Sequence, residues 1–125
     1  MTPFGARLRE IRQRKGLSQQ DFARQLGVSA AYVSALEHGR RGRPSFAFVQ
    51  GVIHALGVIW DEADELVKLA EVSDPQVVID TAGLDPAATL LANRLARDIA
   101  GLDDTTIAEL CAVLEKSRQR PVAGG

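Results

Sequence analysis

Three arginines stand close together at Arg40, Arg41 and Arg43, with Gly42 between the last two and Pro44 behind them. A guanidinium holds its N–H donors in a planar fork that matches two phosphate oxygens, so arginine is suited to a nucleic-acid backbone. A basic loop is usually only solvated. Three guanidinium groups within four residues are better explained by phosphates, and the segment is predicted to bind a polyanion.

Charge is unevenly distributed along the chain, although the formal net charge is only −1. Residues 1–60 hold nine Lys and Arg against three Asp and Glu, whereas residues 61–125 hold six against thirteen. This asymmetry predicts that the first half meets a polyanion and that the second half has another role. The alternative is an uneven surface that is merely solvated.

The sequence shows no set of residues typical of an enzyme or a metal site. Cys111 is the only cysteine, and no cysteine or carboxylate cluster accompanies His38 or His54, so no disulfide, zinc site or cofactor is expected. Cys111 falls on an apolar helix face with Ile107 and Leu114, where a buried, unreactive thiol is predicted. The chain is therefore not expected to be an enzyme.

The composition is typical of one folded domain, or of a small domain with an appendage. The 125 residues are 46% apolar and 25% charged, and only six are aromatic, which predicts an aliphatic, all-α core. No apolar run approaches the ~20 residues of a membrane-spanning helix, and the basic N-terminus lacks the apolar stretch of a secretion signal. We therefore expect a cytoplasmic protein.

Five helices are predicted in the first 71 residues from apolar spacing and from start and stop signals. They cover residues 3–15, 19–26, 30–38, 46–56 and 61–71. Ser18, Ser29 and Ser45 stand where N-caps are needed, and Gly27 and Gly57 follow two of the helices. The inward residues of the fourth helix are predicted to be Phe46, Val49, Ile53 and Leu56.

Two or three amphipathic helices are predicted after residue 72. A short one covers 75–82 and ends at Gly83, a second runs from Asp85-Pro86 to Gly101, and the last covers 105–118. The predicted domains are accordingly a five-helix domain (1–72), a helical dimerisation or interaction segment (73–120) and a disordered tail (121–125).

The second and third helices carry the most specific motif in the chain. Its segments are Gly16-Leu17-Ser18-Gln19-Gln20-Asp21-Phe22-Ala23, Leu26-Gly27-Val28-Ser29 and Tyr32-Val33-Ser34-Ala35-Leu36-Glu37-His38-Gly39. They resemble the helix-turn-helix of the phage repressor and Cro family, often called the xenobiotic-response-element type. The resemblance covers about residues 3–72. It implies a lambda-repressor-like fold of five helices and a transcriptional regulator that binds double-stranded DNA.

The resemblance also implies which residues contact DNA. The third helix would enter the major groove, and the base contacts fall on Ala30, Ala31, Tyr32, Ser34 and Ala35. The phosphate contacts fall on Gln19, Ser29, Arg40, Arg41 and Arg43. Because the base-contact positions are short or apolar, readout is expected from thymine methyl groups, from hydroxyls and from DNA shape.

Other residues of this domain are assigned structural roles. Ala23 must be small where two helices cross, and Gly27 suits the left-handed conformation of a short turn. Arg12 and Glu37 match a pair that, in relatives, forms a salt bridge between the first and third helices. Arg14 and Lys15, near the end of the first helix, could face DNA.

The C-terminal segment is predicted to pair two copies of the chain. Its apolar residues form a seam at spacings typical of paired helices, namely Leu84, Ala88, Leu91, Leu95, Ile99, Leu102, Ile107, Leu110 and Leu114. A segment of about fifty residues seldom closes its own core. The alternative is a monomer in which the segment folds back over Leu66, Val67 and Ala70.

These features together predict a repressor that binds a two-fold operator as a homodimer in the bacterial cytosol, on the nucleoid. The alternative is a protein-interaction module, such as an antitoxin-type partner that neutralises another protein and regulates its own gene. The acidic pairs Asp61-Glu62 and Asp64-Glu65 favour that alternative slightly. The expected partners are double-stranded DNA, a second copy of the chain and, under the alternative, another protein; no membrane is expected.

Overall fold

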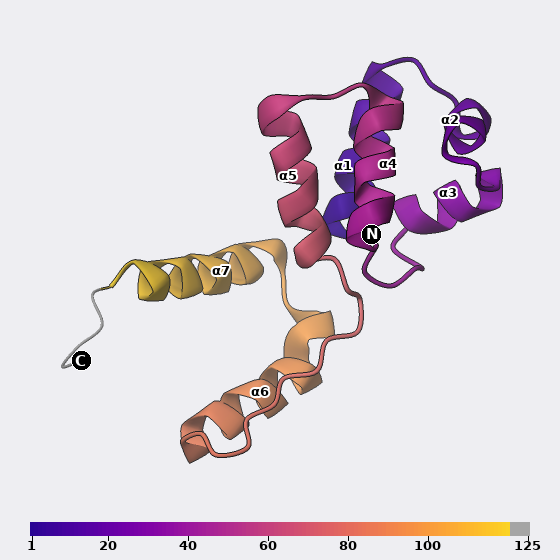
Figure 1. Cartoon of the computed structure of the whole chain (residues 1–125). Helices are drawn as coiled ribbons and strands as arrows, with labels where there is room; N and C mark the ends of the chain where they lie inside the picture. Colours follow the sequence, from indigo (N-terminus) through magenta and orange to yellow (C-terminus); the bar gives the residue numbers. More distant parts are fainter. Residues whose placement is uncertain (121–125) are drawn as a thin grey trace. The chain divides into compact units, whose positions relative to one another are not determined.

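The computed structural model describes residues 1–120, and every regular element in that range is a helix (Figure 1). The elements are α1 (Pro3–Arg14), α2 (Gln19–Leu26), α3 (Ala30–Glu37), α4 (Phe46–Leu56), α5 (Trp60–Glu71), α6 (Pro86–Asp98), the 3₁₀ helix η1 (Ile99–Gly101) and α7 (Asp104–Gln119). The predicted all-α class is confirmed. The chain divides into two units, Met1–Val78 and a second that begins at Ile79. The tail predicted for 121–125 lies outside the described residues.

Three helices of the first unit have a serine as N-cap, at the positions expected from the sequence. The Oγ atoms of Ser18, Ser29 and Ser45 accept the backbone N–H three residues later, at 3.0, 3.0 and 3.2 Å. Each bond satisfies an N–H group that has no partner inside its helix. Gly27 ends α2 with a φ of 74°, a left-handed conformation that a side chain would strain.

The first unit closes its core with apolar side chains from all five of its helices. α5 packs on α1 and α4, α2 packs on α3 and α4, and α1 also contacts α3. The buried cluster consists of Phe4, Leu8, Ile11, Phe22, Ala23, Val33, Leu36, Val49, Val52, Leu56, Val58, Leu66 and Ala70. Ser73 belongs to the same unit, because its buried Oγ accepts the Phe4 N–H at 2.9 Å.

The prediction that Phe46 of α4 lies in the core is wrong. Phe46, the first residue of the helix, is 70% exposed, whereas Val52 is fully buried. The spacing 46, 49, 53, 56 is helical, but the face that meets the core runs through Val49, Val52 and Leu56.

The prediction of a short helix over residues 75–82 is also wrong, since residues 77–81 have no regular structure. The carboxylates of Asp74 and Asp80 accept the N–H groups of Gln76 and Ala82 at 3.0 and 2.9 Å, which forms local turns in place of a helix. The β-branched residues 77–79 between them are exposed, so no packing compensates for their weak helix preference.

α1 and α3 approach closely at Gly5, a contact that the sequence did not reveal. A Cβ atom on Gly5 would lie 2.4 Å from the carbonyl oxygen of Leu36 and 2.9 Å from that of Glu37. Both oxygens belong to the backbone of α3, so neither can rotate away. Glycine at this position therefore sets the distance at which the two helices pack.

The same two helices are joined by a buried ion pair. Arg12 Nε and Nη2 donate to the two carboxylate oxygens of Glu37 at 2.7 and 3.0 Å. Arg12 Nη1 also donates to the carbonyl of Leu17 at 2.7 Å, and Gln19 Nε2 donates to Glu37 at 3.2 Å. Glu37 is fully buried. The bidentate geometry supplies the hydrogen bonds that a carboxylate needs in an interior of low dielectric constant.

Acidic residues of α5 neutralise part of the positive charge of α1. Arg7 lies 2.7 Å from Glu65, and Arg14 donates to Glu62 at 2.7 Å. The hydrogen bond from Arg14 lowers the pKa of the Glu62 carboxyl below its ordinary value. Residues 1–78 hold ten Lys and Arg against nine Asp and Glu. The predicted division into a basic and an acidic half therefore does not coincide with the division of the fold.

The second unit differs from the first because α6, η1 and α7 bury no residue. Asp103 caps the N-terminus of α7, because its carboxylate accepts the Thr106 N–H at 2.7 Å. Ala88, Leu95 and Leu102 are only half-buried within the unit. Its helices are thus defined by local signals rather than by a core.

We expect Gly5→Ala to destabilise the protein by about 1–3 kcal/mol, because the added methyl must push α1 away from the carbonyls of α3. Gly51→Ala is the matched control. Gly51 also lies inside a helix, but its Cβ would meet only Leu26 Cδ2 at 3.8 Å, so helix propensity should stabilise this variant by ~0.5–1 kcal/mol. Urea unfolding followed by circular dichroism measures both. Equal effects of the same sign would contradict the close approach.

We expect Arg12→Met to cost about 3–5 kcal/mol, because it leaves the Glu37 carboxylate buried without its charge partner. The double variant Arg12→Met/Glu37→Leu should be more stable than the single one, since no buried charge remains. Arg24→Met is the control: it breaks an exposed pair with Asp21 at 3.8 Å and should cost less than about 1 kcal/mol. A single variant as stable as this control would exclude a structural role for the pair.

Candidate nucleic-acid interface

α2 and α3 form a compact two-helix motif joined by residues 27–29 (Figure 1). Ala23 is buried in the core, and the N–H of Val28 in the turn donates to its carbonyl at 3.0 Å. α3 directs Val33, Leu36 and Glu37 inward, which leaves its opposite face to the outside. A helix fits the major groove of B-DNA, which is about 12 Å wide.

The outward face of α3 carries only short side chains and one tyrosine. Ala31 is exposed, and Tyr32, Ser34 and Ala35 are half-buried. Ala30 was expected to be exposed, but it is half-buried and packs against the core. Positions 30, 33 and 37 lie on one helical face, so Ala30 shares the inward side of Val33 and Glu37.

The two predicted phosphate contacts outside the arginine loop lie at helix N-termini. Gln19 is the first residue of α2. Its side chain is oriented by the hydrogen bond that it donates to Glu37 of the buried ion pair. Ser29 caps α3; its Oγ accepts the Tyr32 N–H, and its own proton is left to donate. Backbone N–H groups at a helix N-terminus attract a phosphate.

The arginine loop, residues 40–44, is anchored at both ends. Gly39 has a φ of 73°, and a Cβ there would lie 2.8 Å from the backbone nitrogen of Thr2. The Arg40 N–H donates to the Ala35 carbonyl at 2.9 Å, and Ser45 at the other end caps α4. The guanidinium-bearing residues 40, 41 and 43 are all exposed. The loop therefore keeps its positive charges close to α3.

Arg41 is attached to α3 by an aromatic contact that the sequence did not predict. Its guanidinium carbon lies 4.7 Å from the centre of the Tyr32 ring. Tyr32 in turn meets Phe48 edge to face, with ring centres 5.6 Å apart and 64° between the planes. The negative face of an aromatic ring attracts a guanidinium. Tyr32, which was expected to project freely toward the bases, is held between α4 and the arginine loop.

Two further expectations for charged and polar side chains are corrected. Arg14, which could have faced DNA, is paired with Glu62 of α5. Cys111, predicted to be buried, is exposed, and so are Ile107 and Leu114 on the same face of α7.

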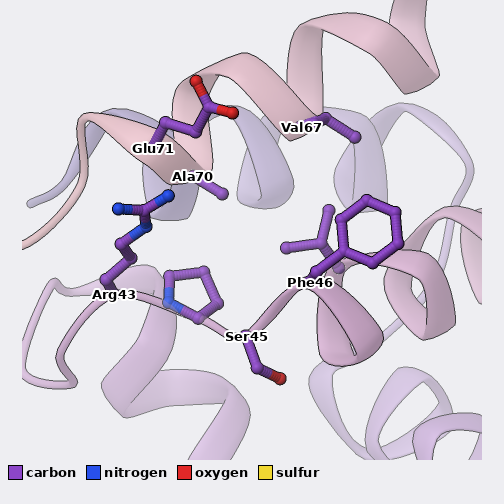
Figure 2. Close-up of a pocket in the computed structure, with 8 residues that line it drawn as sticks. Arg43, Ser45, Phe46, Val67, Ala70 and Glu71 are labelled. Carbon is purple, nitrogen blue, oxygen red and sulfur yellow. The ribbon is translucent and has the colours of Figure 1, made fainter.

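A surface hollow of about 270 Å³ lies beside the arginine loop (Figure 2). Its lining consists of Arg43, Pro44, Ser45, Phe46, Val49, Val67, Ala70 and Glu71. Figure 2 shows Phe46 at this hollow with Val67 of α5, which accounts for the exposure of Phe46. Arg43 and Glu71 are its only charged residues, so the hollow is largely apolar and offers no paired groups for acid–base chemistry.

A metal site would need clustered ligands, and a membrane span would need a long apolar helix. Among residues 1–120 no three His, Cys, Asp or Glu side chains are grouped so that they could hold a metal ion. None of the helices there is both long enough and apolar enough to cross a lipid bilayer.

The comparisons with known proteins agree with this geometry. A family model described as a helix-turn-helix domain matches residues 3–66. The HTH-type transcriptional regulator YazB of Bacillus subtilis (strain 168) is 37% identical over 59 residues, 47% of this chain and 84% of YazB. The HTH-type transcriptional repressor RghR of the same organism is 36% identical over 61 residues, 49% of this chain; the chain spans only 45% of RghR.

Among solved structures, the crystal structure of the clp gene regulator ClgR from C. glutamicum is 36% identical, with a TM-score of 0.47. The match covers 59% of this chain and 92% of that one.

The family match over residues 3–66 includes the whole α2–α3 motif and the arginine loop. The resemblance predicted from the sequence is therefore confirmed, and the chain belongs to the helix-turn-helix family of DNA-binding transcriptional regulators, which are not enzymes.

Proposed function

We propose that this chain represses transcription by binding a two-fold operator as a homodimer in the bacterial cytosol. The observation that carries the proposal is the outward face of α3 next to three exposed arginines, on a motif whose inner face is packed. The relative RghR is named as a transcriptional repressor, which supports repression as the outcome of binding.

In this proposal α3 enters the major groove, with Ala31, Ser34 and Ala35 toward the base edges. Arg40 and Arg43 contact phosphates on either side of the helix. The acids of α5 pair with Arg7 and Arg14 of α1, whereas the three loop arginines are exposed and keep their positive charge beside α3. A local field of that sign steers DNA toward α3.

Gln19 and Ser29 complete the phosphate contacts in the same proposal. Both lie at N-termini of the motif helices, and the ion pair beneath them holds Gln19 in position. Because these groups contact the backbone of any sequence, they fix the orientation of α3 rather than its preference for bases.

The second unit supports the pairing of two copies. Leu84, Leu91, Ile99, Ile107, Leu110 and Leu114 of the predicted seam are each at least 39% exposed, and an apolar surface of this kind needs a partner. Leu66 and Ala70 already lie in the core of the first unit, so they are not left for the C-terminal segment to cover. A second copy also matches the two half-sites of a two-fold operator.

We expect Arg43→Ala to weaken DNA binding about equally on all sequences and to lower the slope of log K against log salt by about one, because one phosphate contact is lost. Lys68→Ala is the charge-matched control, since Lys68 is exposed on α5, away from the motif. Fluorescence anisotropy at several salt concentrations measures both. If the slope of log K against log salt is the same for Arg43→Ala and Lys68→Ala, a contact between the loop and DNA is excluded.

We expect Leu91→Asp to convert a dimer into a monomer at micromolar concentration and to lower operator affinity by about 10²–10⁴-fold, because two half-site contacts are then no longer linked. Leu90→Asp is the matched control: Leu90 is 54% exposed, close to the 55% of Leu91, but lies off the seam. Analytical ultracentrifugation distinguishes the two variants.

A wild-type chain that sediments as a monomer would exclude the homodimer, and its capture of a different protein in a defined ratio would favour the interaction-module alternative. Truncation tests the same point when made after Val78, the end of the first unit. A cut after Val72 would remove Ser73, whose Oγ accepts the Phe4 N–H, and would damage the DNA-binding unit itself.

A further inference from the structure

The outward face of α3 lacks the side chains that usually read guanine. In the major groove, guanine presents the acceptors N7 and O6, which arginine or lysine contacts with two hydrogen bonds. Ala31 and Ala35 carry no hydrogen-bonding group, and Ser34 and Tyr32 carry one hydroxyl each, which cannot donate two hydrogen bonds. If α3 alone read the operator, discrimination of G·C pairs would be weak.

One guanidinium is nevertheless held against this helix. Arg41 comes from the loop, yet its guanidinium carbon lies 4.7 Å from the centre of the Tyr32 ring. Tyr32 is the third residue of α3 and so lies in its first turn. The N-terminal residues of a recognition helix are the ones that reach base edges. Arg41 is therefore placed next to the part of α3 that meets the bases.

The surroundings of Arg41 restrict its freedom. The edge-to-face contact with Phe48 fixes Tyr32 from α4, and the loop is anchored at Gly39 and Ser45. A side chain held in advance loses less entropy on binding than one that is free in solvent. Arg40 and Arg43 are exposed as well, but in the described chain the aromatic contact is made by Arg41.

We propose that Arg41 reads a guanine in each half-site instead of contacting a phosphate, and that Tyr32 is the positioning residue that presents it. This rests on the proposed function, in which α3 lies in the major groove. It revises the sequence-based expectation that all three loop arginines contact phosphates. Two parts of the chain then share recognition: α3 supplies apolar contacts, and the loop supplies the bidentate donor.

The test begins with in vitro selection of duplexes by the intact protein from a random library. In the selected duplex, each G·C pair is replaced by A·T, and the affinity is measured again. At one position per half-site, the wild type should discriminate by about 5- to 150-fold. Arg41→Ala removes the guanidinium that would donate to guanine N7 and O6, so it should lose this discrimination. Arg43→Ala, the matched control, should lose affinity and keep the discrimination.

Substitutions of Tyr32 test its positioning role. Tyr32→Phe keeps the ring and should keep the discrimination, whereas Tyr32→Leu should lower it several-fold although Arg41 is still present. Thermal unfolding of Tyr32→Leu checks that the fold persists, and Phe48→Leu gives a second perturbation of the stack from α4. Discrimination that survives in Arg41→Ala or in a folded Tyr32→Leu variant overturns the inference.

Failure of the inference can be told apart from failure of the proposed function. If selection enriches a sequence but Arg41→Ala weakens all variants of it equally, Arg41 contacts a phosphate and only the inference fails. If the wild-type protein enriches no sequence at all, sequence-specific binding itself is absent and both fail.

Discussion

The first unit depends on the buried pair of Arg12 and Glu37. A charge pair inside a core adds little net stability, but either partner left alone is costly, so the pair favours the one packing in which both are satisfied. That packing brings α1 against the end of α3, at a distance that Gly5 makes possible. The rotation of α3 about its own axis follows, and with it the set of residues that faces outward.

The composition of the candidate interface follows from this packing of α1 against α3. Because the inward face of α3 takes Val33, Leu36 and Glu37, the outward face is left with small residues and one tyrosine. The strong hydrogen-bond donors come from the arginine loop instead. Meanwhile the acids of α5 pair with arginines of α1. A unit with almost no net charge thus presents the three positive groups of the arginine loop beside α3.

The two units differ in how they are stabilised. In the first, thirteen apolar residues form a closed cluster, and the buried polar side chains of Arg12, Glu37 and Ser73 are hydrogen-bonded. In the second, caps and turns such as that of Asp103 define the helices, while the apolar faces of α6 and α7 are exposed. Helices without a core gain stability mainly from association. This contrast supports the proposal that the first unit contacts DNA and that the second unit pairs two copies of the chain.

The amino-acid sequence alone determined the helices, their caps and the helix-turn-helix motif. Ser18, Ser29 and Ser45 act on the backbone three residues away, and Gly27 acts on its own φ, so neighbouring residues suffice to specify them. The same local signals failed at residues 75–82, where a proline start was present but no surface was available to bury the helix.

Contacts between distant residues were decided by the tertiary structure. Phe46 and Cys111 were expected inside from their helical spacing, yet both are exposed, because burial depends on which surface meets a helix face. The approach at Gly5 and the stack of Arg41 on Tyr32 have no local signal at all. Spacing along a chain specifies which residues share a helix face, whereas only the packing of the helices determines what that face contacts.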